Sequence, residues 1–166
     1  MGFDGGGEGR IYTKEKEMVI VSNSCEDMHY LMRINVGDSR LREKGNLLLV
    51  GSCMDRFPDL VKEICKREGA QSVLHICLEE THMNQAGFKI SSIVKYSDIK
   101  RVTVLTADGS PHCIQLHYVI EDIKRHFAPE IEVVHYVVEK GKLLRISSEA
   151  VKVSRHLSKI QKMIGD

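Results

Sequence analysis

The chain has 166 residues, a length that predicts one domain with a sizeable hydrophobic core. Hydrophobic residues make up 42% of it and charged residues 28%, which is the balance of a globular protein. The net charge of +1 leaves no overall field to attract nucleic acid, and no apolar stretch approaches the length of a membrane-spanning helix. We therefore expect neither a nucleic-acid partner nor a membrane partner.

The amino-terminal segment begins MGFDGGGEGR and lacks the apolar stretch of a secretory signal. We expect residues 1–16 to be a flexible glycine-rich tail and residues 17–166 to form a single α/β domain. The five cysteines are odd in number and are spread without a disulfide-type framework. A reducing, cytoplasmic location is the expectation that follows.

The first elements are expected before residue 45. The run EMVIV at residues 17–21 predicts a strand, at the edge of a sheet. Apolar residues at helical spacing predict a helix over residues 28–36, and the polar residues 39–44 predict a linker.

From residue 46 onward, strands and helices are expected to alternate. Turn and capping residues separate the apolar runs: Gly69 ends one helix, and Ser110 followed by Pro111 begins another. Residue 87 is read as a break before a further helix. The expected strands are 46–51, 72–78, 101–106, 131–138 and 143–146, and the expected helices are 58–68, 87–97, 111–126 and 147–163.

Alternating strands and helices imply right-handed crossovers and a parallel sheet. The predicted fold is therefore an α/β, three-layer open sheet that is mostly parallel and Rossmann-like, with helices on both faces.

Two cysteines follow strands of this predicted sheet. Cys53 comes directly after the strand 46–51, and Cys113 lies in the first turn of the helix that follows the strand 101–106. If these two strands are neighbours on either side of the switch point, the two thiols face each other across a crevice where ligands collect. A thiolate there would bind a soft metal or attack an electrophile. The alternative is that both are small residues filling tight turns.

Polar neighbours of the two cysteines are further candidates. His112 is adjacent to Cys113, and successive helical residues point about 100° apart, so the two compete as metal ligands. Asp55 and Arg56 predict a carboxylate oriented by a guanidinium, which could hold a bound water or a metal. The alternative is a helix cap beside a solvated arginine.

Other candidate residues lie on the middle strand, on a helix and in a loop. His75 and Cys77 point to the same face, with Cys77 nearer the crevice and His75 expected to be buried and hydrogen-bonded. His117 is expected in the core behind Cys113. A ligand or general base could also come from a loop that is solvated by default, at Glu79, Glu80 and His82.

Two motifs carry a family resemblance. The first is Cys53-Met54-Asp55-Arg56, one residue shorter than a Cys-x-Asp-x-Arg pattern, and the second is the loop TADGSPHC, whose Cys113 comes 60 residues after Cys53. Together with the surrounding strands and helices, these make residues 45–138 resemble the β-carbonic anhydrases. In the second motif, His112 and Cys113 match the family's His-x-x-Cys only after a shift of register.

The resemblance implies a zinc site and a function. Zinc would be bound by Cys53 and by Cys113 or His112, and Asp55, steered by Arg56, would close the site or accept a proton from zinc-bound water. Such a lyase would hydrate carbon dioxide or a similar small electrophile through zinc-bound hydroxide. The resemblance also implies a homodimer.

Two other functions remain open at this stage. One is a non-catalytic ligand-binding or interaction subunit that uses the crevice without a metal and binds a partner protein. The other is a thiol redox protein in which Cys53 and Cys113 form a reversible disulfide. For the lyase and for the redox protein, the expected partner is a small-molecule substrate.

Overall fold

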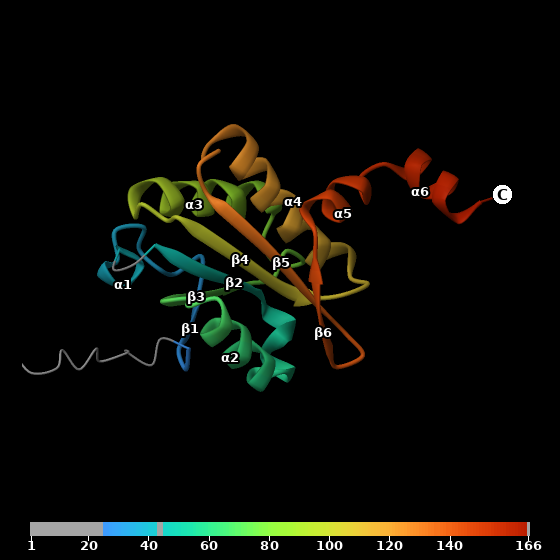
Figure 1. The fold of residues 1–166 in the computed structure, drawn as a ribbon. Helices are drawn as coiled ribbons and strands as arrows, with labels where there is room; N and C mark the ends of the chain where they lie inside the picture. The colour runs from blue at the N-terminus through green and yellow to red at the C-terminus, as the bar shows by residue number, and fades with distance from the viewer. Residues whose placement is uncertain (1–24, 43–44, 166) are drawn as a thin grey trace, which may run out of the picture.

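The computed structural model describes residues 25–42 and 45–165, which contain one six-stranded sheet in the order β1-β3-β2-β4-β5-β6. Neighbouring strands run parallel except for β6, which is antiparallel to β5 (Figure 1). The strands are β1 (Met28–Tyr30), β2 (Asn46–Gly51), β3 (Ser72–Ile76), β4 (Arg101–Ala107), β5 (Glu132–Glu139) and β6 (Lys142–Ile146).

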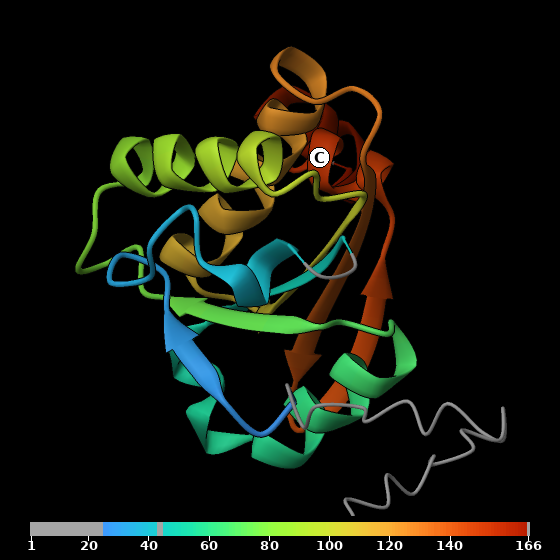
Figure 2. The ribbon, with the colours of Figure 1, turned by 90° about the vertical axis from the view of Figure 1, so that its left-hand side faces the viewer.

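Helices cover both faces of the sheet. Figure 2 shows α3 and α4 on one side and α2 on the other. The helices and one 3₁₀ turn are α1 (Ser39–Arg42), η1 (Ser52–Arg56), α2 (Pro58–Arg67), α3 (Met83–Tyr96), α4 (Pro111–His126), α5 (Ser148–Val153) and α6 (Leu157–Ile164).

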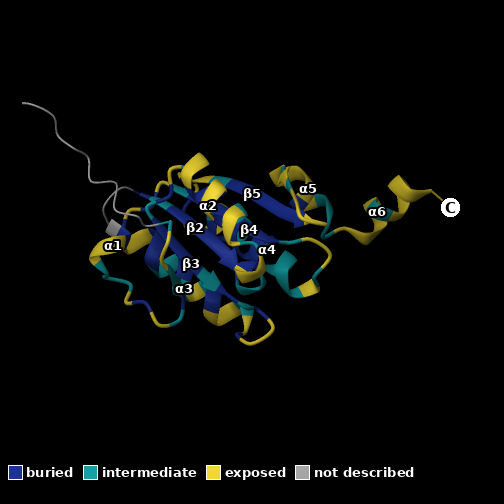
Figure 3. Cartoon of the chain, turned by 90° about the horizontal axis from the view of Figure 1, so that it is seen from below, coloured by how far each residue is buried: buried dark blue, intermediate teal, exposed yellow. Residues whose placement is uncertain are grey.

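The central strand β2 separates two hydrophobic cores. Leu47 and Leu49 pack with the buried residues of α3 and α4, whereas Leu48 and Val50 pack with those of α2. All four are at most 1% exposed, because alternate residues of a strand point to opposite faces and both faces are covered (Figure 3). The predicted three-layer, mostly parallel α/β fold is confirmed.

The C-terminal segment differs from the rest of the fold. The helix expected over residues 147–163 is interrupted after α5, where Ser154 ends the helix, and α6 follows as a separate helix with no buried residue. Figure 1 shows α6 extending away from the sheet. None of the helices in the described ranges is long and apolar enough to cross a membrane.

The structure corrects the expectations made before residue 45. Residues 28–36 do not form a helix: Met28–Tyr30 is the edge strand β1, paired in parallel with β3. The open edge of β3 offers backbone hydrogen bonds that outweigh a weak helical pattern. Within the expected linker, residues 39–42 form α1. The strand expected at residues 17–21 and the tail at 1–16 lie outside the described residues.

The helix expected after Gly87 begins earlier. α3 starts at Met83 because the Nδ1 atom of His82 accepts a hydrogen bond from the backbone N–H of Asn84. Gly87 therefore lies inside the helix, where a Cβ atom would come 3.4 Å from Val119. The glycine is explained by the close approach of α4 and not by a helix break.

One disulfide bond corrects the expectation that the cysteines form no such framework. Cys25, just before β1, is bonded to Cys65 on α2, 40 residues later in the chain. Cys53, Cys77 and Cys113 are free thiols. The sequence does not reveal the pair, since one disulfide among five cysteines has no diagnostic spacing. The cytoplasmic location stays a prediction.

Candidate functional site

Cys53 and Cys113 meet at the carboxyl ends of two neighbouring strands. β2 pairs in parallel with β4, Cys53 lies in the 3₁₀ turn after β2, and Cys113 lies in the first turn of α4 after β4. Their Sγ atoms are 3.5 Å apart. A Cβ atom at Gly51 would come 3.5 Å from one sulfur and 3.6 Å from the other, so the glycine backbone forms one wall of the pair.

The beginning of α4 fixes the position of Cys113. Ser110 is the N-cap residue, and its hydroxyl oxygen accepts a hydrogen bond of 3.3 Å from the backbone N–H of Cys113. Pro111 occupies the first helical turn, where its missing N–H costs nothing. Both roles agree with the sequence prediction.

The electrostatics of the pair depend on burial and on the short contact between the sulfurs. Burial, together with the adjacent sulfur of Cys53, raises the pKa of the Cys113 thiol above its ordinary value, although a hydrogen bond with Ser110 opposes the rise. Negative charge on both sulfurs would be mutually repulsive, and a bound cation would offset that repulsion.

A cavity of about 300 Å³ opens onto the two sulfurs, and we call it the thiol cavity. Apart from Cys53 and Cys113, its lining includes five side chains with ligating or charged groups: Arg56, Cys77, Glu79, Asp108 and His112. His112 is partly buried beside Cys113, and Cys77, which follows the end of β3, also lines this cavity.

The residues that face the thiol cavity offer two converging metal ligands. Two thiolates bound at about 2.3 Å to one tetrahedral zinc ion lie roughly 3.8 Å apart, which is close to the separation of the sulfurs. Within residues 25–42 and 45–165, no three side chains of the histidine, cysteine, aspartate or glutamate type converge to hold a metal. The sulfurs therefore fit two positions of a zinc ion, and the third protein ligand is not in place.

The ion pair expected between Asp55 and Arg56 is absent from the described part of the structure. Both side chains are exposed, and they diverge because adjacent residues of a 3₁₀ turn point about 120° apart. The Nε atom of Arg56 instead donates to the backbone oxygen of Cys53 at 3.3 Å, and its guanidinium lies 6.0 Å from the ring centroid of Phe57.

Of the other sequence candidates, His75 and His82 take structural positions outside the lining of the thiol cavity. His75 is partly buried, its Nδ1 atom lies 3.0 Å from the hydroxyl of Ser52, and burial lowers its pKa. His82 caps α3. Glu79 lines the thiol cavity, whereas Glu80 is exposed and has no place in that lining.

A buried chain of hydrogen bonds was missed by sequence reasoning. His117 is buried as expected, but its Nε2 atom lies 2.9 Å from the hydroxyl of Thr106 and its Nδ1 atom lies 2.9 Å from Nδ1 of His135. The Nε2 atom of His135 is 2.7 Å from the carboxylate of Glu121. The signal was His135, a histidine inside the apolar run of β5, which needs a hydrogen-bonding partner when buried.

Burial keeps both histidines neutral. It lowers the pKa of His117 to about 3, with His135 adding to the effect, and it lowers the pKa of His135 although Glu121 opposes this. Burial alone would raise the pKa of Glu121, but hydrogen bonds from Ser148 and His135 outweigh it and hold that pKa below its ordinary value. The chain of groups therefore carries one negative charge, on Glu121.

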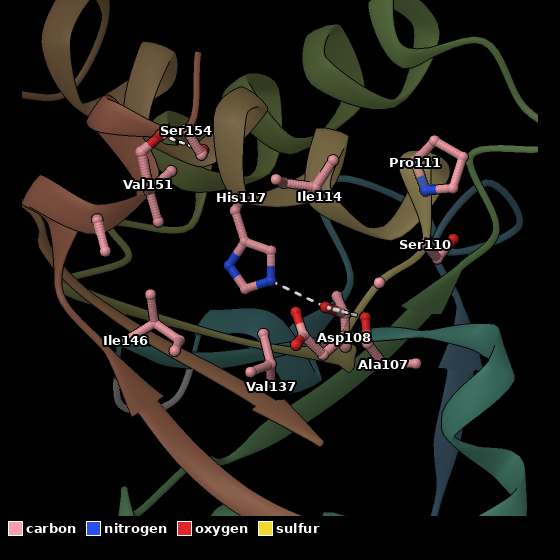
Figure 4. A pocket seen from close by; sticks show the side chains of 13 residues that line it. Ala107, Asp108, Ser110, Pro111, Ile114, His117, Val137, Ile146, Val151 and Ser154 are labelled. Carbon is pink, nitrogen blue, oxygen red and sulfur yellow. Dashed lines mark hydrogen bonds between the residues drawn. The ribbon is translucent and has the colours of Figure 1, made fainter. Parts of the chain in front are cut away.

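A second cavity, of about 450 Å³, lies beside this chain, and we call it the histidine cavity (Figure 4). It is bordered by the loop between β4 and α4, by the ends of β5 and β6, and by α5. The segment from Thr106 to Ser110 lines both cavities and so separates them.

Comparison with known proteins identifies a family and no individual relative. A family model described as a Rossmann-like domain matches residues 39–165. The searches of curated proteins and of solved structures found no match.

Proposed function

The chain belongs to the Rossmann-like domain family, and on this scaffold we propose that Cys53 and Cys113 form a zinc-binding dithiolate centre. The observation that carries the proposal is the distance of 3.5 Å between their Sγ atoms at the switch point of the sheet, between β2 and β4. In open α/β sheets, ligands bind in this crevice.

Other side chains of the thiol cavity would complete the centre. We propose His112 as the third ligand: its partly buried imidazole lines the same cavity beside Cys113, and it would have to turn toward the sulfurs when zinc binds, since no third ligand converges on them in the described residues. Zinc with three protein ligands would supply a bound hydroxide at neutral pH, as a lyase of the carbonic anhydrase type requires. Carbon dioxide or a similar small electrophile is the proposed substrate class.

Arg56 and Asp55 would serve this chemistry in different ways. Arg56 lines the thiol cavity and binds the backbone oxygen of Cys53, so its guanidinium can attract an anionic product such as bicarbonate. Asp55 is exposed and does not pair with Arg56, so we propose that it would act only through solvent, by accepting a proton that zinc-bound water gives up.

Metal content is the test of this proposal. The full chain, purified with a reductant and without chelators, is expected to hold one zinc ion and to hydrate carbon dioxide in a stopped-flow assay. Cys53→Ser and Cys113→Ser should lose the zinc and the activity. Cys77→Ser is the matched control, because Cys77 lines the same cavity without contacting the pair. A wild-type chain that takes up no zinc would end the proposal.

A thiol redox centre is the second candidate, and one observation favours it. No third ligand converges on the sulfurs in the described ranges, and a dithiol needs none. A disulfide oxidant such as oxidised glutathione would convert the two thiols to a disulfide bond, and it would itself take up the two electrons and two protons and leave as two thiols.

Alkylation separates the two candidates, under denaturing conditions for the redox centre and in the native protein for the zinc centre. When Cys53 and Cys113 are reduced and the Cys25–Cys65 disulfide is intact, the chain has three thiols that can be alkylated: Cys53, Cys77 and Cys113. A redox centre predicts one thiol after treatment with oxidised glutathione and three after mild reduction. A zinc centre predicts that one bound zinc ion per chain protects two of the three thiols in the native protein.

A further inference from the structure

The histidine cavity has apolar walls and one charged side chain. Its walls come from α4, β5, β6 and α5, through Ile114, Val137, Ile146 and Val151 (Figure 4). Among the residues that the structure describes, no lysine or arginine lines it, and Asp108 is the one residue of the lining with a carboxylate. A volume of about 450 Å³ lies in the range of small-molecule sites.

The buried hydrogen-bond chain beside this cavity has a fixed direction. Ionised Glu121 can only accept, so Nε2 of His135 must donate to it and Nδ1 of the neutral His135 must accept. The Nδ1 atom of His117 therefore donates to His135, and its Nε2 atom accepts. The hydroxyl of Thr106 must then donate to His117.

This direction decides what the cavity wall can offer to a ligand. The oxygen of Thr106 also lies 3.3 Å from the backbone oxygen of Ala107, but its one hydrogen serves the shorter contact, of 2.9 Å with His117, so only lone pairs are left for a ligand. The carboxylate of Asp108 is also an acceptor, and no ion pair to it exists in the part of the chain that the structure describes. Thr106 is a buried residue of β4 and Asp108 is an exposed residue of the turn that follows it, and both line this cavity.

We propose that the histidine cavity binds a small primary amine in its protonated form. The ammonium group would donate hydrogen bonds to Asp108 and Thr106, and the apolar body of the amine would contact Val137 and Ile146. The charge suits the site because the lining holds no competing cation. Thr106 and Asp108 also line the thiol cavity, but Cys53 and Cys113 do not line the histidine cavity, and amine binding there does not depend on the proposed function.

Three probes of one shape test the ligand class. Benzylamine, benzyl alcohol and benzoate differ at the head group alone, and their binding to the full chain is measured by NMR shift titration at pH 7.5. Benzylamine is expected to shift the resonances of Val137, Ile146 and Val151 saturably, benzyl alcohol to bind at least roughly tenfold more weakly, and benzoate not to bind. Benzoate binding as tightly as benzylamine, or no saturable binding of benzylamine, would overturn the proposal.

Variants localise the effect. Asp108→Asn should weaken benzylamine roughly tenfold and leave benzyl alcohol unchanged. Asp98→Asn is the matched control, because Asp98 is an exposed aspartate before β4, at the opposite end of that strand, and pairs with Lys100. Ala150→Phe places a ring at a position that lines only this cavity and should abolish binding. An unchanged benzylamine affinity in Asp108→Asn would contradict the assignment.

The direction of the hydrogen-bond chain can be measured from the positions of the imidazole protons. Imidazole ¹⁵N spectra are expected to show the proton of His117 on Nδ1 and that of His135 on Nε2, and the reverse pattern would overturn the argument. The double variant Cys53→Ser, Cys113→Ser should bind benzylamine as the wild type does. If this variant still binds benzylamine, the amine site exists whether or not the chain binds zinc.

Discussion

The Sγ atoms of Cys53 and Cys113 lie 3.5 Å apart although 60 residues separate them in the chain. The contact exists because β2 and β4 are hydrogen-bonded neighbours, which brings the turn after β2 against the first turn of α4. After β2 the chain continues to β3 on one side of β2, whereas β4 lies on the other side. The connections therefore leave a crevice open between the carboxyl ends of β2 and β4.

Acid is expected to destabilise the fold through the buried histidines. The pKa of His117 is lowered to about 3, so between pH 6.5 and that value the unfolded chain binds a proton that the folded chain does not. The free energy of unfolding should therefore fall as the pH falls through this range, by up to about 1.4 kcal/mol per pH unit for each such group. His135, whose pKa is also lowered, adds to the same trend.

Urea unfolding at pH 7.5, 6.0 and 5.0 checks this expectation. His156→Gln is the control, because it removes an exposed histidine between α5 and α6 that lies outside the buried hydrogen-bond chain. A stability that is flat between pH 7.5 and 5.0 would show that the two imidazoles are not held neutral.

Removing the hydroxyl of Thr106 is expected to destabilise the protein by about 1–3 kcal/mol. Thr106→Val keeps the shape but leaves Nε2 of the buried His117 without a donor. Thr106→Ser retains the hydroxyl and should lose less. Equal unfolding free energies for the two variants in urea titrations would count against the hydrogen bond.

The Cys25–Cys65 disulfide is expected to stabilise the fold by about 4 kcal/mol, because it closes a loop of 40 residues in the unfolded chain. Thermal unfolding of Cys25→Ser, Cys65→Ser should show a lower Tm than the wild type. A reductant should lower the Tm of the wild type toward that of the variant, and should not change the variant. An identical Tm with and without reductant in the wild type would argue that the bond does not form.

Truncation after residue 156 is expected to change the unfolding free energy by less than about 0.5 kcal/mol. The deletion removes α6, none of whose residues is buried. Its exposed apolar residues include Leu157 at 82% and Ile164 at 76%. A large loss of stability in calorimetry would mean that these side chains are covered in solution.

The sequence predicted the alternating part of the fold because that part has strong local signals. The type of an element is indicated by apolar runs such as residues 46–51. The start of a helix is indicated by capping residues such as Ser110 and Pro111. β1 could not be predicted, because a three-residue strand at a sheet edge is defined by its partner β3 and not by its own residues. The Cys25–Cys65 bond is equally a product of tertiary contact.

The candidate site was predictable only in part. The proximity of Cys53 to Cys113 follows from strand order, for which the doubly wound pattern is a good guide. The pairing of Asp55 with Arg56 fails because a 3₁₀ turn separates their directions, and a turn type cannot be read from four residues. The contact of His117 with His135 joins α4 to β5 and becomes visible only when the helix is packed on the sheet.

The most direct test of the zinc proposal is the zinc-edge X-ray absorption spectrum of the chain loaded with one equivalent of zinc. We predict two sulfur ligands at about 2.3 Å, with the remaining ligands nitrogen or oxygen, and the same spectrum for Cys77→Ser. A spectrum with no sulfur ligand, or one unchanged in Cys53→Ser, would contradict the proposal.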